Sequence, residues 1–243
     1  MMRLDKFLSD AGLGSRAQVK DLLKKKQVLV NGKLEKSPKA QINEQEDQVQ
    51  VSGQLVTYEK FVYYVLNKPK GVLTARQDPE RKTVLDLLDA SAFDKGVSPV
   101  GRLDLNTHGL LLLTNNGQLS HAMLSPKKHV SKLYRAHVNG IMDEEDVERF
   151  AQGIEFKEFT SLPAQLEIVE VDEENHRCIV EIRLSEGKFH QVKRMVQACG
   201  KNVTDLQRLT MGPLSLDPAL EPGDYRRLTD QEMASLEIFD VEL

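Results

Sequence analysis

The sequence has few of the side chains that build metal centres and disulfide frameworks. Only two of its 243 residues are cysteines, Cys178 and Cys199, and they form no CxxC pair. The six histidines show no HExxH-type spacing. Structural zinc sites and disulfide-stapled domains both need closely spaced sets of such residues. We therefore expect neither a disulfide framework nor a metal site.

Long apolar runs and nucleotide-binding loops are also missing. No apolar stretch approaches the roughly 18–20 residues that a membrane-spanning helix needs. A charge occurs within the first three residues, which is not typical of a signal peptide. Neither a P-loop nor a dinucleotide fingerprint is present. The expectation is a soluble, cytoplasmic protein with no membrane partner and no nucleotide cofactor.

The charge of the chain is small in total and uneven in distribution. The net charge is −4, yet residues 1–39 contain ten Lys and Arg against four Asp and Glu, a local charge of +6. Residues 214–243 contain eight acids against two arginines, a local charge of −6. A basic region of this kind favours binding to a polyanion. A solvated helix face explains the same charges equally well at this point.

The first 52 residues predict a compact unit of two helices and a hairpin. Apolar residues at helical spacing over 4–11 predict the first helix. Ser15, with a glutamine three residues later, has the capping-box pattern that begins a second helix. The Asn-Gly pair at 31–32 follows two alternating valines and predicts a tight hairpin. We place this unit at 1–52, and we read 53–60 as a short polar linker.

The remainder, residues 61–243, mixes short strands with scattered helices. Such a mixture favours an α+β domain built around a mixed, largely antiparallel sheet. The expected strands lie at 61–66, 110–114, 133–138, 165–171 and 177–184, and the expected helices at 82–89, 118–124, 143–152 and 189–199.

One carboxylate, Asp104, has an unusual setting in the segment GRLDLNTHG at 101–109. The apolar run LLLLTN at 110–115 follows it and predicts a strand, so Asp104 lies at the lip of that strand. A charge in this position contributes little to packing and is well placed for chemistry. Taken alone, Asp104 is explained equally well as a turn former or as the partner of Arg102.

Two further polar clusters accompany predicted strands. A basic loop at 127–132 runs into the strand that carries Tyr134. Another strand ends at Leu184, and the basic residues of 188–194 gather at the start of the helix that follows. Each has an ordinary explanation, since tyrosines are often core aromatics and surface lysines are usually solvated. Together they can converge on one cleft. No Ser–His pattern supports acyl hydrolysis.

The first 50 residues resemble the S4 RNA-binding domain. The likeness rests on RLDKFL at 3–8, SR at 15–16 and VLVNG at 28–32, and it departs from the family at 26–27, where a glycine usually precedes the hairpin strand. This resemblance implies an RNA-binding surface, to which we assign Arg3, Lys6, Ser15, Arg16, Lys20 and Lys24.

Nearly the whole chain resembles the RsuA-type pseudouridine synthases. The motifs are GRLD at 101–104 with Thr107 and Gly109, LNKPKG at 66–71 and EGKFHQVKRM at 186–195. The implied fold is α+β, a small S4 domain followed by a pseudouridine synthase domain with a mixed sheet.

The same resemblance implies roles for individual residues. Asp104 is the catalytic nucleophile, Tyr134 stacks on the target base, and Lys193 pairs with the aspartate, with the adjacent Arg194 as the alternative partner. Leu184 is an apolar wall of the pocket. The further substrate contacts are Arg102, which fills the gap left by the base or holds a flanking phosphate, and Lys188, His190 and Arg194.

The chemistry of such an enzyme suits these residue types. Uridine loses its C1′–N1 bond, the uracil turns, and it rejoins through C5, so no redox or group-transfer cofactor is needed. A glycosidase would need two carboxylates and a water, whereas one carboxylate stands out here. A nearby cation favours the ionised form of that carboxylate. The target base must also leave its stack.

The substrate we expect is one uridine of 16S ribosomal RNA in a partly assembled small subunit, modified by a monomeric enzyme. The turn at 190–195 and the segment PGDYR at 222–226 favour this small-subunit assignment. The alternatives are a 23S synthase of the same family and a non-catalytic ribosome assembly factor that uses its S4 domain.

Overall fold

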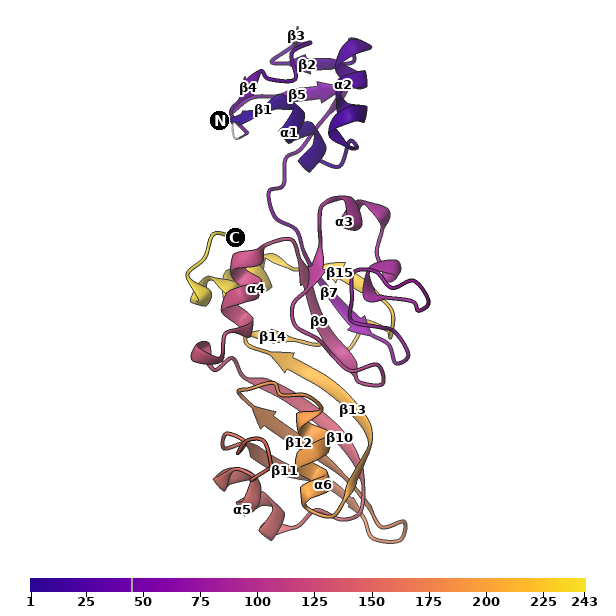
Figure 1. The fold of residues 1–243 in the computed structure, drawn as a ribbon, viewed down its shortest axis with the longest axis vertical. Helices are drawn as coiled ribbons and strands as arrows, with labels where there is room; N and C mark the ends of the chain where they lie inside the picture. The colour runs from indigo at the N-terminus through magenta and orange to yellow at the C-terminus, as the bar shows by residue number, and fades with distance from the viewer. Residues whose placement is uncertain (45) are drawn as a thin grey trace. The chain divides into compact units, whose positions relative to one another are not determined.

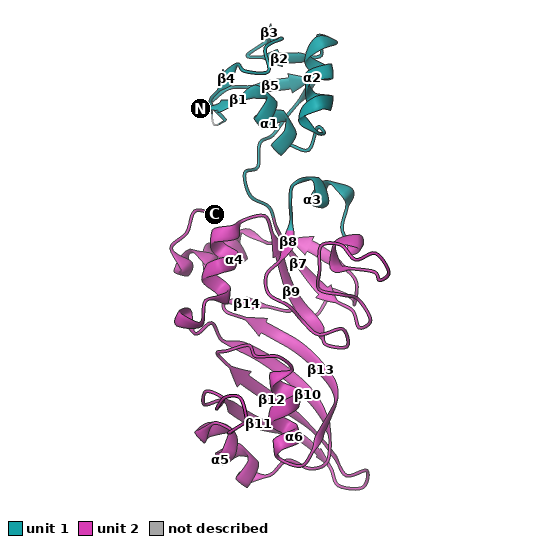
Figure 2. Ribbon diagram, viewed as in Figure 1, with its two compact units in different colours: residues 1–62, 88–97 teal, residues 63–87, 98–243 magenta. Residues whose placement is uncertain are grey.

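The computed structural model describes residues 1–44 and 46–243 (Figure 1). These residues form two compact units (Figure 2). Unit 1 comprises Met1–Val62 and Leu88–Val97, and unit 2 comprises Tyr63–Leu87 and Ser98–Leu243. Within the described ranges, no helix has the length and apolar character needed to cross a membrane.

The helices of unit 1 confirm the sequence prediction. Helix α1 spans Leu4–Asp10 and helix α2 spans Arg16–Lys24. The Ser15 side chain accepts from the backbone N–H of Gln18, and the Gln18 side chain accepts from the Ser15 N–H, so the capping box is formed. A cap of this kind stabilises a helix by about 1 kcal/mol. The third helix of the unit, α3, spans Ala90–Asp94.

The strands of unit 1 include the predicted hairpin. Asn31 and Gly32 both have positive φ, at 50° and 75°, as a two-residue hairpin turn requires. The hairpin strands β2 and β3 extend through β5 and β6 into a small sheet, and β1 pairs with β4. The bounds are β1 Met2–Arg3, β2 Val28–Val30, β3 Lys33–Leu34, β4 Gln41–Ile42, β5 Val49–Val51 and β6 Gln54–Leu55.

The segment expected to be a polar linker is partly folded. Strand β6 pairs with β5, and Val56 and Tyr58 pack against the core of unit 1. The ring of Tyr58 stacks on Phe7 with centroids 5.3 Å apart. The sequence reading of 53–60 as linker missed these apolar residues because polar neighbours separate them. The domain boundaries at 52 and 61 stay predictions.

The main sheet of unit 2 is mixed and largely antiparallel, as predicted. Its described strands run in the order β11-β12-β10-β13-β9-β7-β15, with β14 beside β13 and β8 beside β9. The bounds are β7 Tyr63–Lys68, β8 Ser98–Pro99, β9 His108–Thr114, β10 Lys132–Asn139, β11 Gln165–Asp172, β12 Arg177–Leu184, β13 Asn202–Met211, β14 Leu214–Ser215 and β15 Tyr225–Arg227.

Three of the four predicted helices of unit 2, at 118–124, 143–152 and 189–199, are present, and the structure adds α7 (Asp230–Ser235), which was not predicted. The fourth predicted helix, 82–89, is instead a short 3-10 turn, η1, which follows Thr83, whose N–H and hydroxyl both donate to the Asp86 carboxylate. Helices α5 and α6 lie against one half of the sheet around a core that includes Phe150, Ile182 and Met195 (Figure 1). The bounds are η1 Val84–Leu87, α4 Gly117–Leu124, η2 Pro126–Lys128, α5 Glu144–Gln152, α6 Gln191–Ala198, α7 Asp230–Ser235 and η3 Leu236–Phe239.

A short parallel contact joins the two halves of the sheet. Strand β13, which the sequence reading did not predict, pairs with β9 at Gln207↔His108 and Arg208↔Gly109. A Cβ on Gly109 would lie 2.4 Å from the carbonyl oxygen of Arg208, so this close approach requires glycine. The Asp104 loop enters β9 at this junction, which places the carboxylate next to both halves.

Candidate active site

The loop that carries Asp104 is anchored by a buried lysine. Lys68, at the end of β7, has no exposed surface. Its ammonium donates to the carbonyl oxygens of Pro69 and Thr107 at 3.0 Å, and to those of Asp104 and Leu105 at 3.3 Å. These contacts compensate for the burial of a charge, which is costly when it is unpaired. Lys68 therefore fixes the path of the chain on both sides of the carboxylate.

Burial also weakens the hold of Lys68 on its proton. It lowers the pKa of Lys68 to about 8, against the opposing influence of the Asp104 charge. At neutral pH the ammonium form still predominates, so all three of its protons are available for the carbonyl contacts.

A second anchor holds the residue before Asp104. The Thr74 hydroxyl donates to the carbonyl of Leu103 at 2.8 Å and accepts from the Leu103 N–H at 3.2 Å. The Thr107 N–H donates to the Asp104 carbonyl at 3.1 Å and closes the turn. The backbone is thus fixed while the carboxylate itself remains 30% exposed.

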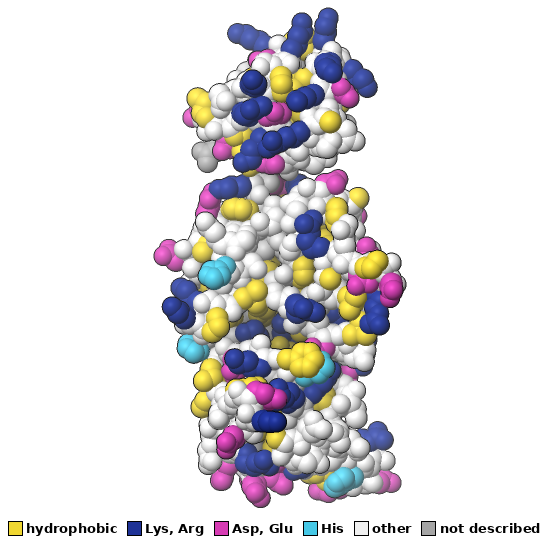
Figure 3. Space-filling model, in the orientation of Figure 1, with side chains coloured by type: hydrophobic (Ala, Val, Ile, Leu, Met, Phe, Trp, Pro, Cys, Tyr) yellow, Lys and Arg dark blue, Asp and Glu magenta, His cyan; other side chains and the backbone are white. Residues whose placement is uncertain are grey.

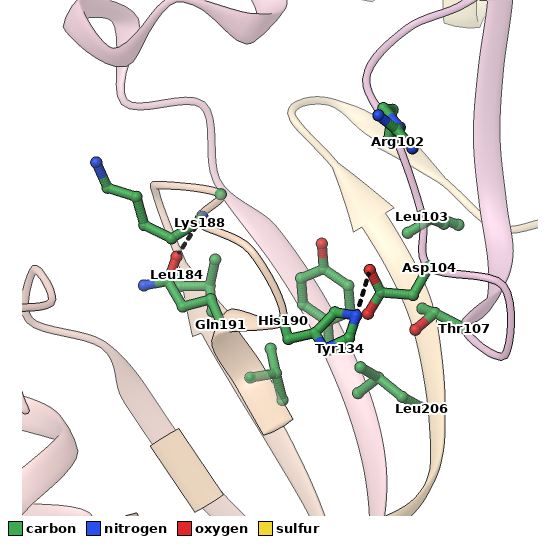
Figure 4. Close-up of a pocket in the computed structure, with 12 residues that line it drawn as sticks. Arg102, Leu103, Asp104, Thr107, Tyr134, Leu184, Lys188, His190, Gln191 and Leu206 are labelled. Atoms are coloured by element: carbon green, nitrogen blue, oxygen red, sulfur yellow. Dashed lines mark hydrogen bonds and ion pairs between the residues drawn. The ribbon is translucent and has the colours of Figure 1, made fainter. Parts of the chain in front are cut away.

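Two basic side chains flank the Asp104 carboxylate. His190 Nε2 lies 3.5 Å from Oδ1, and Lys193 Nζ lies 3.5 Å from Oδ2. Both distances are longer than a typical hydrogen bond, so neither side chain holds the carboxylate by a tight bond. Figure 4 shows the carboxylate directed at the His190 ring.

The structure distinguishes between the two basic residues that the sequence offered as partners. Lys193 is the one beside Asp104. The Arg194 guanidinium instead donates to Glu158 at 2.6 Å and lies over the Phe156 ring, 4.7 Å from its centroid. The assignment of Arg194 as a substrate contact stays a prediction, and its observed partners are structural.

The turn before α6 is held in place by Gln191. Its side-chain oxygen accepts from the Lys188 N–H at 2.8 Å, and its amide donates to Glu186. His190 occupies the left-handed region with φ 51° and forms the N-cap of α6. This turn aims His190 at Asp104, whereas the Lys188 side chain extends away from it (Figure 4) and lies over the Phe159 ring.

A small cavity lies next to the carboxylate. Tyr134 and the buried Leu184 line it, together with Leu103, Thr107, Val192 and Leu206. Apolar walls with a few convergent polar groups are typical of ligand sites. The cavity brings Asp104, Tyr134 and Leu184 together, as the sequence analysis expected.

A larger cleft of about 760 Å³ continues from this cavity. Arg102 lines it from the exposed side of the loop. The Phe189 ring is 76% exposed and stacks on the His190 ring with centroids 3.8 Å apart. The cleft therefore offers an aromatic surface and several cations, which suits a nucleic acid strand.

The predicted RNA contacts of unit 1 are all exposed. Arg3 is paired with Asp5 at 2.7 Å, and Lys24 lies 3.6 Å from Asp21. Ser15 is engaged in the cap of α2. Figure 3 shows many Lys and Arg side chains on the visible face of unit 1. The exposed residues are Arg3, Lys6, Ser15, Arg16, Lys20 and Lys24, and their RNA contacts stay predictions.

Sequence reasoning missed several residues of the site. Lys68 belongs to the motif at 66–71, but only the fold reveals that it anchors the loop. Lys132 and Arg208 line the cleft and are buried; Lys132 belongs to the basic loop at 127–132 but was not named as a site residue, and Arg208 was not noticed. In the described ranges, no group of three or more His, Cys, Asp or Glu is arranged to hold a metal ion.

Comparison with known proteins places this arrangement in a family. A model of the RNA pseudouridylate synthases matches residues 62–198, and an S4 domain model matches residues 2–49. An uncharacterised RNA pseudouridine synthase of Bacillus subtilis, YtzG, is 44% identical and covers 96% of this chain and 97% of its own. The ribosomal small subunit pseudouridine synthase A of Vibrio cholerae is 40% identical, over 97% of this chain and 99% of its own.

A large-subunit relative and a crystal structure extend this comparison. The ribosomal large subunit pseudouridine synthase B of Bacillus subtilis is 36% identical, over 97% of this chain and 96% of its own. A crystal structure of a pseudouridylate synthase, 35% identical, matches with a TM-score of 0.66 over 97% of this chain and 100% of that one. The sequence, the fold and the carboxylate-bearing cleft agree, and the chain belongs to the RNA pseudouridylate synthase family, with an S4 domain within its first 49 residues.

Proposed function

We propose that this protein isomerises one uridine of 16S ribosomal RNA to pseudouridine, with Asp104 as the catalytic nucleophile. The observation that carries the proposal is the position of Asp104. Its backbone is fixed by Lys68 and Thr74, and its carboxylate lies between His190 and Lys193 at the mouth of a cavity lined by Tyr134.

The reaction needs no atoms beyond those of the uridine and water-exchangeable protons. The C1′–N1 bond breaks, the uracil turns, and a C1′–C5 bond forms. The proton on C5 is lost and N1 gains one, so product and substrate are isomers. A single carboxylate serves this chemistry by attack at C1′ or at the uracil ring, or by taking a proton from the sugar. All three routes use the carboxylate form of Asp104, and the Lys193 side chain lies 3.5 Å from one of its oxygens.

The substrate base has to reach Asp104 from a stacked strand. We propose that the target uridine flips into the cavity and stacks on Tyr134, with Leu184 as the opposing wall. Arg102, exposed beside the cleft, then fills the vacated position or holds a flanking phosphate. His190 and Lys188 extend the contact along the strand.

Two relatives support different ribosomal substrates. The Vibrio cholerae relative, at 40% identity, is named for the small subunit, and the Bacillus subtilis relative, at 36%, for the large subunit. The higher identity favours 16S RNA, and 23S RNA is the second candidate. We further propose that the enzyme acts in the cytoplasm, as a monomer, on partly assembled small subunits.

The test is pseudouridine mapping of both ribosomal RNAs after incubation with the purified protein. Free RNA and assembly intermediates of the small subunit serve as substrates, and the Asp104→Asn protein serves as the matched control. One new site in 16S RNA, absent with the variant, supports the proposal. A site in 23S RNA contradicts the substrate assignment. Binding without conversion on any RNA contradicts the enzymatic proposal and favours an assembly factor.

A further inference from the structure

Two cations lie buried in the cleft beside the proposed base pocket. Lys132 on β10 is 9% exposed, and Arg208 on β13 is 2% exposed. The Lys132 ammonium donates to the carbonyl of Val130 at 2.8 Å. Arg208 Nε donates to the carbonyl of Leu110 at 2.8 Å, and its Nη2 is buried with no hydrogen-bond partner among the described residues. These contacts leave donors of both side chains unused.

Neutral groups, rather than acids, hold both cations. Among the described residues, no Asp or Glu forms an ion pair with Lys132 or Arg208, and each side chain donates to a backbone carbonyl. Burial, and then the charge of Arg208, lower the pKa of Lys132 to about 8. Two neighbouring buried cations are unfavourable in the protein alone, because each is desolvated and repels the other. An anion from outside would relieve both penalties.

The position of Lys132 and Arg208 indicates which anion would bind there. Lys132 and Tyr134 are two residues apart on β10, and side chains at that spacing share one face of a strand. Arg208 is the cross-strand partner of Tyr134 on β13. All three line the cleft that also contains Asp104. The cations therefore adjoin the tyrosine on which the target base is proposed to stack.

We propose that Lys132 and Arg208 form a subsite for one backbone phosphate of the RNA, the phosphate adjoining the uridine that enters the cavity. This inference rests on the proposed function. Guanidinium and ammonium groups are the usual protein ligands of phosphate. A nucleotide that flips into the cavity carries its phosphate with it, so the subsite is filled only when the base is in place. The pair is thus a positioning device for the flipped nucleotide.

This role differs from that of the exposed cations of unit 1. An exposed lysine attracts RNA before and after the base flips, so it contributes equally to both states. A subsite beside Tyr134 gains its phosphate only with the flipped nucleotide, so it favours that state over the stacked one. Its loss should weaken tight binding and lower the rate of conversion at saturating RNA.

The test is a double-mutant cycle between the protein and the RNA. The protein is the full chain carrying Asp104→Asn, so that bound RNA is not converted, with or without Lys132→Gln. The RNA is an oligonucleotide containing the uridine identified by mapping, with or without a neutral methylphosphonate at the linkage on its 5′ or 3′ side. Lys128→Gln, at an exposed lysine of η2, is the matched control.

The subsite predicts that Lys132→Gln and one methylphosphonate each weaken binding by about tenfold, and that together they weaken it no further. With Lys128→Gln the same methylphosphonate should have its full effect. The slope of log affinity against log salt should fall by about 0.7 with Lys132→Gln, the value for one phosphate of a single strand. Lys132→Arg, which keeps the charge, should restore binding and shows that the site is folded.

Two further outcomes separate the subsite from the proposed function. If the wild-type protein converts the unmodified oligonucleotide but the two losses are additive at both linkages, the subsite is wrong and the proposed function stands. If the wild-type protein converts no RNA that it binds, the proposed function is wrong, and with it the flipped nucleotide on which the subsite depends.

Discussion

The exposed lysines of unit 1 differ in burial from three cations of unit 2, and we expect the two groups to act differently on RNA. The lysines of α2, such as Lys20 and Lys24, are exposed to solvent. In unit 2, Lys68 beneath the Asp104 loop and the cleft residues Lys132 and Arg208 are buried, and backbone carbonyls hold all three. Charges of the same sign therefore occur in two environments: the first group keeps its hydration, and the second has lost it.

Exposed cations lose little solvation when they meet a phosphate, and they release counterions, so they supply affinity that falls with salt. Buried cations have already lost their hydration, and their positions are fixed by the chain around them. They contribute geometry, in the Asp104 loop and beside Tyr134. The comparison teaches that loss of the exposed cations of unit 1 should weaken RNA binding and leave the rate of conversion unchanged, whereas loss of a buried cation of unit 2 should lower that rate.

Removing the Asp104 carboxylate should produce the largest effect, because it removes the proposed nucleophile. Asp104→Asn should reduce single-turnover conversion by about 10⁴-fold or more, while RNA affinity changes little. Asp172→Asn, at the end of β11, is the control and should convert RNA normally. Conversion by Asp104→Asn at the wild-type rate would rule out Asp104 as the nucleophile.

Removing the loop anchor should produce the next largest effect. Lys68→Met removes one donor from each of four carbonyl oxygens, and only those of Asp104 and Leu105 keep a backbone N–H donor among the described contacts. We expect a loss of about 1–3 kcal/mol in the free energy of unfolding and a decrease in turnover of about 100-fold from displacement of the carboxylate. Urea denaturation and single-turnover rates measure the two effects. Lys70→Met, at a lysine that pairs with Asp205 instead, is the matched control; equal effects of both variants would contradict the anchor.

The pH dependence of RNA binding should be a smaller effect than that of Lys68→Met, and it should originate from Lys132. Burial and the charge of Arg208 lower its pKa to about 8. Below pH 8 the ammonium is present and binds phosphate, and above pH 8 the free protein loses that proton. The affinity of the Asp104→Asn protein for RNA should thus fall up to about tenfold between pH 7 and 9.5. Lys132→Arg should flatten the profile, because guanidinium stays charged. Lys68, whose pKa is also about 8, remains in this variant, so any pH dependence that is left can be assigned to groups other than Lys132. An unchanged profile in Lys132→Arg would contradict this assignment.

Changes in unit 1 should have the smallest effect on chemistry. Lys20→Gln with Lys24→Gln should weaken RNA binding several-fold and reduce the salt slope by about 0.7 for each phosphate that the variant no longer neutralises. Binding at several salt concentrations measures the slope, and the turnover rate at saturating RNA should not change. A salt slope identical to that of the wild-type protein would count against RNA contacts at α2.

Local patterns in the sequence predicted much of the fold. The helix beginning after Ser15, the Asn-Gly hairpin at 31–32 and most strands of unit 2 depend on neighbouring residues, so they can be read directly. Strand β13 was missed because its buried cation Arg208 and its polar neighbours hide the alternation that marks a strand. The 53–60 segment was misread for a related reason, since its apolar residues are isolated in the sequence.

The residues of the candidate site that belong to family motifs could be predicted from the sequence. Those recognised only by their burial in the fold could not. Asp104, Tyr134 and Leu184 were named from the sequence, and the fold brings them to one cavity. The choice between Lys193 and Arg194 needed the structure, because adjacent residues of a helix point in different directions. Lys132 and Arg208 read as ordinary basic residues, because the sequence does not show which lysines and arginines become buried.

The most direct test of the central claim is a comparison of kcat and KM on one RNA for the wild-type protein, the Lys20→Gln and Lys24→Gln double variant, and Lys68→Met. If exposed cations bind and buried cations position, the double variant should raise KM with kcat unchanged, and Lys68→Met should lower kcat with little change in KM. A lowered kcat in the double variant, together with a normal kcat in Lys68→Met, would contradict the account.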